Sequence, residues 1–335
     1  MSYSPYIYVA IPLSVAIALG LARKWRSRKW GKCMSNICLR GKTYLITGAN
    51  SGIGLETAKA LVKRKARVIL ACRDLEKARQ TAAEIRKEEL GGELIPMQLD
   101  LASFESIEKF VELVKTGFYK IDCLINNAGV VTPLSLDQKT KEGFEIHLGV
   151  NHLGHFYLTN LLLDLLKKAA PSRIVVVSSM LHEKGTLNFD DLNMRKQIED
   201  AKKGKSSRRN PGYDNSKLMN VYFARALAGK LRADGIDVYA CCPGFCYTNL
   251  FSVNNDHYVL YTLCNFFLLC HLRLNVTFQG AETVVFCATD YSVEGHTGKF
   301  YRECAEYAPS YNYTKEEESR LWEMSEEMVK ARRPL

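Results

Sequence analysis

The sequence predicts an α/β fold, with a doubly wound parallel sheet and flanking helices on both of its faces. Apolar segments of strand character alternate with helical segments through most of the 335 residues. The glycine-rich segment 43–54, TYLITGANSGIG, joins the first strand to the first helix. Polar residues directly follow several strands, at the edge where parallel sheets bind their ligands. Together these observations are typical of a Rossmann-type sheet.

The glycine-rich turn has the features that a dinucleotide site requires. Gly48 permits a tight turn, Gly52 lets the backbone approach a pyrophosphate, and Gly54 lets the helix pack close to the strand. The first amides of that helix point toward the anion. The spacing G-x-x-x-G-x-G differs from the commoner fingerprint, so an ordinary strand-to-helix turn is the alternative for this segment alone. We expect six cofactor contacts in the turn: Gly48, Asn50, Ser51, Gly52, Ile53 and Gly54.

Four more strands alternate with helices along the chain. We expect these strands at 67–71, 94–99, 121–125 and 173–177. We expect helices at 55–62, 75–90, 107–114 and 144–166. Because the carboxyl ends of parallel strands meet at one edge, the polar residues there should converge. These residues are Thr47, Arg73, Asp100, Asn126 and Ser179.

The end of the second strand favours NADP(H) over NAD(H). Where a carboxylate would bind the ribose 2′-hydroxyl of NAD, the sequence has Cys72 followed by Arg73. A guanidinium suits a 2′-phosphate because it can donate two parallel hydrogen bonds. Asp74 leaves an alternative open, since one residue of misalignment would restore a ribose-binding acid. A solvated Arg–Asp turn is a further alternative.

The next two strand ends also carry candidate cofactor ligands. Asp100 either accepts a hydrogen bond from an adenine amino group or caps the following helix, for which Ser103 is a competing cap. The segment 126–129, NNAG, directly follows the fourth strand. Its carboxamides can line a cofactor cleft and tie neighbouring strands together, and we expect Asn127 to contact the cofactor.

Three histidines, His147, His152 and His155, lie on the expected helix 144–166. Their spacings of five and three residues are not accompanied by a cysteine or carboxylate that would complete a ligand set. We therefore expect ordinary helical histidines and no metal site.

Tyr213 and Lys217 are four residues apart at the start of an expected helix, 213–231, and therefore share one helix face. A nearby ammonium favours the phenolate and lowers the pKa of a tyrosine toward neutrality. Such a tyrosine can act as a general acid or base. Taken alone, a surface pair is the alternative.

Five features occur in order: the turn 47–54, the segment 126–129, Ser179, the pair Tyr213-x-x-x-Lys217, and Pro243-Gly244. In this combination the chain resembles the short-chain dehydrogenase/reductase family from about residue 41 to residue 300. The N-terminal segment, ACRD at 71–74 and NHLGHF at 151–156 resemble the membrane-bound retinol dehydrogenase group.

The resemblance implies a catalytic set. Tyr213 would exchange a proton with the substrate oxygen, while Lys217 would bind the nicotinamide ribose and lower the pKa of Tyr213. Ser179 would hydrogen-bond the carbonyl oxygen, with Ser178 as the alternative. Asn151 would support a water relay behind Lys217.

The resemblance also implies contacts further along the chain. Pro243, Gly244 and Thr248 would border the nicotinamide. Two more strands of the family fold match 236–241 and 297–301.

The chain departs from the family in two places. The gap from Ser179 to Tyr213 is longer than usual and holds a basic stretch, 202–209, which we expect to be a solvated loop. The apolar segment 251–276 lies where the family has its substrate lid, and an apolar lid predicts an apolar substrate. A packed helix without ligand contact and a second membrane contact are the alternatives for this segment.

The N-terminus predicts a membrane anchor over residues 1–22. Residues 6–22 carry no charge, at the short end of the length that a membrane helix needs. No Lys or Arg precedes them and five follow within 23–29, which puts the rest of the chain on the cytosolic side. A cleaved signal peptide, and hence a secreted protein, is the alternative.

The net charge of +10 is concentrated in two patches, 23–32 and 202–209. Neither patch has a nucleic-acid motif, so we expect no nucleic-acid partner, and an anionic membrane surface for the first patch. The 11 cysteines do not have the spacing of a disulfide or zinc framework. We expect mostly reduced, buried thiols.

We therefore expect four parts: the anchor 1–22, a basic linker 23–40, an NADP-binding domain 41–310 and a charged C-terminal helix within 311–335. The predicted function is hydride transfer between NADP(H) and a lipophilic carbonyl or alcohol such as retinal or retinol. The alternatives are a membrane-tethered cofactor-binding interaction protein and a reductase of other lipid aldehydes, ketones or steroids. We expect the protein to lie in the endoplasmic reticulum membrane, and the mitochondrial membrane and the lipid droplet are alternative locations. A homo-oligomer is one possible oligomeric state.

Overall fold

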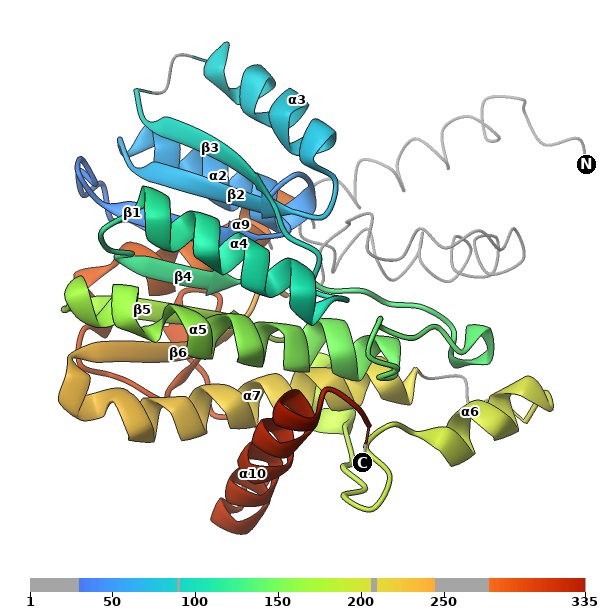
Figure 1. Ribbon diagram of the computed structural model, residues 1–335. Coiled ribbons are helices and arrows are strands. Elements are labelled where there is room, and N and C mark those ends of the chain that lie inside the picture. The colour runs from blue at the N-terminus through green and yellow to red at the C-terminus, as the bar shows by residue number, and fades with distance from the viewer. Residues whose placement is uncertain (1–29, 89–90, 206–209, 245–276, 335) are drawn as a thin grey trace, which may run out of the picture.

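The computed structural model describes residues 30–88, 91–205, 210–244 and 277–334 (Figure 1). Its centre is an eight-stranded sheet with the order β3-β2-β1-β4-β5-β6-β7-β8. The strands β1 to β7 pair in parallel, and β8 pairs antiparallel to β7. The strands are β1 (Thr43–Thr47), β2 (Arg67–Cys72), β3 (Glu93–Gln98), β4 (Cys123–Asn126), β5 (Ser172–Val177), β6 (Ile236–Cys242), β7 (Phe300–Arg302) and β8 (Ala305–Glu306).

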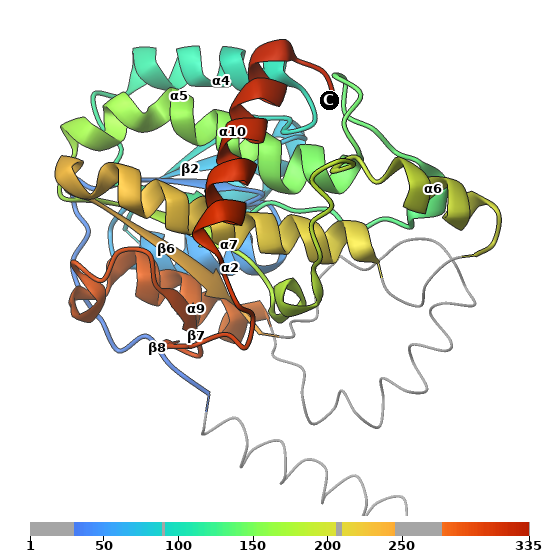
Figure 2. The same cartoon turned by 90° about the horizontal axis from the view of Figure 1, so that it is seen from below.

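Helices cover both faces of the sheet (Figure 2). The helices α2 (Gly52–Lys63), α3 (Leu75–Arg86) and α9 (Thr277–Thr289) pack on one face, whereas α4 (Phe104–Gly117), α5 (Gly154–Lys168) and α7 (Pro211–Leu231) pack on the other. Side chains along each strand alternate between these two layers. In β1, Leu45 belongs to the core under α4, α5 and α7, while Tyr44 and Ile46 belong to the opposite core.

Shorter helices connect or extend these layers. A π-helix, η2 (His147–Leu153), runs directly into α5. The others are η1 (Leu134–Leu136), η3 (Met180–Lys184), α6 (Arg195–Lys202), η4 (Arg232–Asp234), η6 (Tyr291–Val293) and α10 (Lys315–Ala331).

The structure confirms the predicted Rossmann-like sheet with its helical layers. Several boundaries differ, because the end of an element depends on packing that a local pattern does not encode. The expected helix 75–90 ends at Arg86, and the expected last strand 297–301 lies at Phe300–Arg302. The expected helix 144–166 is present, but it begins as the π-helix η2 and continues as α5. The prediction missed α6 and β8, and α6 takes the first residue of the stretch expected to be a basic loop.

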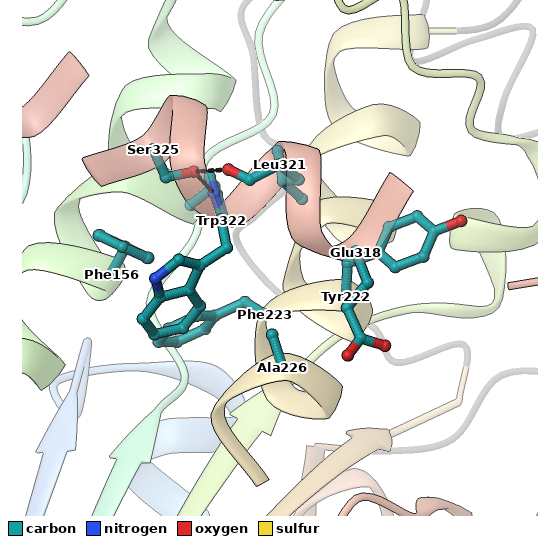
Figure 3. Close-up of a pocket in the computed structure, with 9 residues that line it drawn as sticks. Phe156, Tyr222, Phe223, Ala226, Glu318, Leu321, Trp322 and Ser325 are labelled. Atoms are coloured by element: carbon teal, nitrogen blue, oxygen red, sulfur yellow. Dashed lines mark hydrogen bonds between the residues drawn. The ribbon is translucent and has the colours of Figure 1, made fainter. Parts of the chain in front are cut away.

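The C-terminal helix α10 packs across α7 and α5 (Figure 3). The Trp322 ring stacks on Phe223 at 6.1 Å and 22°, and its centroid lies 4.9 Å from that of Phe156. Glu318 is buried and forms an ion pair with Arg225 of α7 at 3.3 Å. The crevice between these side chains has no room for a water molecule, so α10 is a packed part of the domain rather than a solvated extension.

Several predictions concern residues that the structure does not describe. The anchor 1–22, the apolar segment 251–276 and Thr248 all lie outside the described residues. Among the residues that are described, no helix is long and apolar enough to cross a membrane. The eight described cysteines have free thiols, and five of them are buried.

Replacing Trp322 by alanine should destabilise the domain by about 3–5 kcal/mol, because the indole is buried between α5 and α7. The matched control is Leu113→Ala on α4, whose residue is 61% exposed and which should change stability by less than about 0.5 kcal/mol. Urea unfolding measures both. Equal midpoints for Trp322→Ala and the wild type would contradict the packing of α10.

Candidate active site

The glycine turn between β1 and α2 has the geometry that the sequence predicts. Gly48 and Gly52 have φ values of +68° and +57°, a region that favours glycine. A Cβ on Gly54 would lie 2.3 Å from the Gly48 carbonyl oxygen, so no side chain fits there. This close approach leaves the first turn of α2 directly beside the end of β1, where its amides can face an anion.

Thr47, the last residue of β1, connects this turn to the neighbouring strand. Its hydroxyl oxygen accepts hydrogen bonds from the amides of Asn127 at 2.9 Å and Ala128 at 3.0 Å. The carboxamide of Asn127 donates back to the Thr47 carbonyl at 2.8 Å. Asn127 is therefore held against the glycine turn, as expected of a residue that ties two strands together.

His155 of α5 completes this network. Its Nε2 lies 2.8 Å from the Thr47 hydroxyl, and its Nδ1 lies 3.1 Å from the Asn151 carbonyl oxygen. Burial lowers the pKa of His155 to about 4, so the ring is neutral. The carbonyl can only accept, so Nδ1 carries the proton and Nε2 accepts from Thr47. Sequence reasoning missed this role, because no local spacing relates His155 to Thr47.

Asn151 lies in η2 with its side chain fully engaged. Its Oδ1 accepts from the Val130 amide at 2.8 Å, and its Nδ2 donates to the Val130 carbonyl at 3.1 Å. The same Nδ2 donates to the Ser216 hydroxyl of α7 at 2.9 Å. Asn151 thus joins the segment after β4 to the helix that carries Tyr213 and Lys217.

Tyr213 and Lys217 lie together in the first turns of α7. The helix is capped by Asn210, whose side chain accepts from the Tyr213 amide at 3.2 Å. Lys217 is buried, and its Nζ lies 5.6 Å from the centroid of the Tyr213 ring. The same ammonium donates to the Val177 carbonyl at 3.1 Å, at the end of β5. Burial lowers the pKa of Lys217 to about 8.

The two serines after β5 have different surroundings. Ser178 is buried, and its hydroxyl donates to the Lys217 carbonyl at 2.7 Å. Ser179 is half-buried, and its hydroxyl oxygen accepts from the Leu181 amide at 3.2 Å. The Ser178 proton is therefore used inside the fold, whereas the Ser179 hydroxyl keeps its donor capacity for another group.

The end of β2 carries no acid that faces the glycine turn. Cys72 lies against the amides of Ala49 and Asn50, and burial raises the pKa of its thiol to about 11. Asp74 caps α3, where its carboxylate accepts from the Lys77 amide at 3.0 Å, and this bond lowers its pKa. Arg73 is exposed between them. Asp74 is thus committed to a helix cap, which weakens its assignment to the ribose.

The remaining cofactor candidates have mixed surroundings. Asp100 accepts from the Ala102 amide at 3.0 Å, while Ser103 is the residue that caps α4. Gly244 has φ of +79° and donates its amide to the Cys242 sulfur at 3.3 Å. Pro243 immediately precedes it after β6.

The three helical histidines have separate partners. His147 Nδ1 lies 2.5 Å from the buried carboxylate of Glu145, and its Nε2 accepts from the Thr132 amide at 3.1 Å. His152 Nε2 lies 2.9 Å from the Ser325 hydroxyl of α10. No group of three potential metal ligands occurs within the described ranges.

Comparison with known proteins identifies the family. The model of the family described as "short chain dehydrogenase" matches residues 42–190. Human retinol dehydrogenase 14 is 41% identical over 305 residues, covering 87% of this chain and 87% of the relative. The chain belongs to the short-chain dehydrogenase/reductase family. Mouse retinol dehydrogenase 12, 40% identical over 89% of this chain and 90% of its own length, places it in the retinol dehydrogenase-like group of that family.

A solved structure supports the fold of this short-chain dehydrogenase/reductase. L-sorbose reductase from Gluconobacter frateurii, in complex with NADPH and L-sorbose, superimposes with a TM-score of 0.62. It is 21% identical and covers 80% of this chain and 96% of its own. The retinol dehydrogenase relatives, rather than this fold likeness, show that the protein is a short-chain dehydrogenase/reductase oxidoreductase that acts on alcohols or carbonyls.

Replacing Lys217 by methionine should remove activity without lowering stability at pH 7. The folded-state pKa of about 8 lies below the ordinary value of 10.5, so the unfolded chain binds more protons between these values. Below pH 8 the buried ammonium costs the wild type about 3 kcal/mol, and this cost disappears as the pH rises to 10.5.

Urea unfolding of the wild type and Lys217→Met at pH 7 and pH 10 measures this difference. We expect the variant to be at least as stable as the wild type at pH 7. At pH 10 the free energy of unfolding of the wild type should have risen relative to that of the variant. A variant several kcal/mol less stable at pH 7, with a gap independent of pH, would contradict the burial of a charged lysine.

Proposed function

We propose that this protein transfers a hydride between NADP(H) and a lipophilic carbonyl or alcohol of the retinoid kind. The observation that carries the proposal is the pairing of Tyr213 with a buried Lys217 ammonium, at the end of β5. The same sheet edge carries the glycine turn after β1, so a dinucleotide on the turn can extend toward Tyr213.

The residues around the glycine turn fit the cofactor. The left-handed Gly48 and Gly52 and the contact at Gly54 leave a backbone surface without side chains for a pyrophosphate. Asn127 and Gly244 would border the cleft, and Lys217 would hold the nicotinamide ribose. The family resemblance implies the same bordering role for Thr248, which lies outside the described residues. When bound, the nicotinamide supplies or accepts the hydride.

The chain's own residues would handle the proton. In the reducing direction, the Tyr213 hydroxyl donates its proton to the carbonyl oxygen of the substrate. The Lys217 ammonium stabilises the resulting phenolate. Ser179 is the serine that we assign to the substrate oxygen, since the Ser178 hydroxyl donates to the Lys217 carbonyl. Asn151 would act behind Lys217, where its side chain joins Val130 to Ser216.

We propose that the cofactor is NADP(H) rather than NAD(H), because of the residues at the end of β2. The site of a ribose-binding acid holds the neutral Cys72, Asp74 caps α3, and the exposed Arg73 is able to bind a 2′-phosphate. Because cytosolic NADP(H) is kept mostly reduced, mass action would favour carbonyl reduction.

The proposed substrate and location follow from the relatives and from two apolar segments, 251–276 and the N-terminal anchor. The relatives named above are retinol dehydrogenases, and the apolar segment 251–276 fits a lipophilic substrate. The anchor over 1–22 would hold the domain at a membrane, for which we propose the endoplasmic reticulum with the domain facing the cytosol. A membrane-tethered binding protein without turnover is the second candidate, and its support is limited to that anchor.

The first experiment is an activity panel from retinal to small polar ketones, with NADPH or NADH and the Tyr213→Phe variant. We expect turnover of long apolar carbonyls with NADPH, reduced about 10²- to 10⁴-fold in the variant because the proton donor is lost. Cofactor binding by the variant, followed by NADPH fluorescence, is the control. Tight NADPH binding by the wild type without turnover of any substrate would favour the interaction protein.

The Arg73→Ala variant tests the cofactor preference. Loss of charge-assisted hydrogen bonds to the 2′-phosphate should weaken NADPH binding roughly ten- to a hundredfold and leave NADH binding unchanged. The control is Arg79→Ala on α3, an exposed arginine paired with Glu76 at 3.7 Å. Calorimetric titration measures the affinities, and equal weakening of both cofactors would contradict a 2′-phosphate contact.

A further inference from the structure

The C-terminal segment reaches the loop that carries Ser179. His182, in η3, is buried, and its Nδ1 lies 2.5 Å from the Ser179 carbonyl oxygen. Its Nε2 lies 2.6 Å from the hydroxyl of Tyr313, the second residue before α10. One imidazole thus bridges the C-terminal segment and the serine backbone.

The direction of both hydrogen bonds follows from chemistry. Burial lowers the pKa of His182, so the ring is neutral and carries one N–H. The Ser179 carbonyl can only accept, so Nδ1 carries that proton. Nε2 then accepts from the Tyr313 hydroxyl. With the proton on Nδ1, both ring nitrogens of His182 are hydrogen-bonded, one as a donor and the other as an acceptor.

These bonds fix the backbone at Ser179. The residue is extended, with φ of −150° and ψ of 157°, and its side chain caps η3 by accepting from the Leu181 amide. Its carbonyl also accepts from the His182 amide at 3.1 Å. The hydroxyl oxygen and the carbonyl oxygen are therefore both held from η3, and the ring of His182 connects this arrangement to the C-terminal segment.

Tyr313 is itself held firmly. The Arg225 guanidinium lies 4.9 Å from the centroid of its ring, and the Tyr222 ring meets it edge-on at 5.6 Å. Thr314 caps α10 directly after it, and α10 is anchored by Trp322 (Figure 3). A second hydrogen bond joins the same segment to η3, because the Glu183 carboxylate accepts from the Ser310 amide at 3.0 Å.

We propose that His182 and Tyr313 are positioning residues that set the Ser179 hydroxyl toward the substrate oxygen. The C-terminal segment would thus complete the active site without touching the substrate. This inference rests on the role of Ser179 in the proposed function. Nothing in the local sequence around Ser179 indicates it, since Tyr313 lies 131 residues from His182.

The test uses Tyr313→Phe, with Tyr311→Phe as the matched control. Tyr311 belongs to the same aromatic cluster, with its ring centroid 5.1 Å from that of Tyr313, and its hydroxyl interacts with Tyr222, whereas His182 is bonded to Tyr313. We expect kcat for carbonyl reduction to fall roughly three- to tenfold in Tyr313→Phe and not in Tyr311→Phe. NADPH affinity should stay unchanged in both, because Ser179 serves the substrate.

A double-mutant cycle separates positioning from a general structural effect. If Tyr313 acts through Ser179, Tyr313→Phe should have no further effect on kcat in a Ser179→Ala background. A full additional loss in that background would overturn the proposal. His182→Asn, which keeps a donor near the Nδ1 position, should retain more activity than His182→Leu, and equal activities would likewise count against it.

Hydrogen exchange supplies a readout that does not need turnover. Amides of residues 178–185 should exchange faster in Tyr313→Phe than in the wild type or Tyr311→Phe, because η3 loses the His182–Tyr313 hydrogen bond and keeps only the contacts of Glu183 with the C-terminal segment. Unchanged exchange would overturn the proposal. A wild type that turns over no carbonyl would defeat the proposed function, and the exchange measurement would still decide whether Tyr313 holds the serine loop.

Discussion

The Thr47 hydroxyl is the contact on which the arrangement of the sheet edge depends. It accepts from the amides of Asn127 and Ala128 and donates to His155, whose other nitrogen donates to the Asn151 carbonyl. A hydroxyl has one proton and two lone pairs, and here all three are used. These hydrogen bonds therefore fix the ends of β1 and β4 and the start of α5 relative to one another. Because Thr47, His155 and Asn151 are buried, removing the side chain of Thr47 or His155 would leave a polar group of its partner without water.

The same edge contains a group that works against stability. The Lys217 ammonium is buried, and its principal contact is the Val177 carbonyl, a dipole rather than an opposite charge. Burial lowers its pKa to about 8. A packed apolar side chain would cost the fold less at this position, which agrees with the catalytic role that we propose for the lysine. The rest of α7, with buried residues along most of its length, offsets that cost.

The domain extends beyond the part that matches the family model. That match ends at residue 190, whereas α7, β6, β7 and α10 follow it. The helix α10 packs on α5 and α7 through Trp322 and reaches His152 through Ser325. The segment before α10 lies against η3 through Tyr313. The C-terminal helix, which the sequence predicts only as a charged helix, is thus part of the structure that surrounds the site.

The sequence by itself determined the sheet, the glycine turn and the Tyr213–Lys217 pair, because each depends on neighbours within a few residues. Period-two and helical patterns are local, and a spacing of four residues places two side chains on one helix face. Only the tertiary structure decided the rest. The ring of His155 meets Thr47 across 108 residues, and His182 meets Tyr313 across 131. The different surroundings of Ser178 and Ser179 likewise depend on how α7 docks against β5. Such contacts join side chains from separate elements, and no local period encodes which elements will meet.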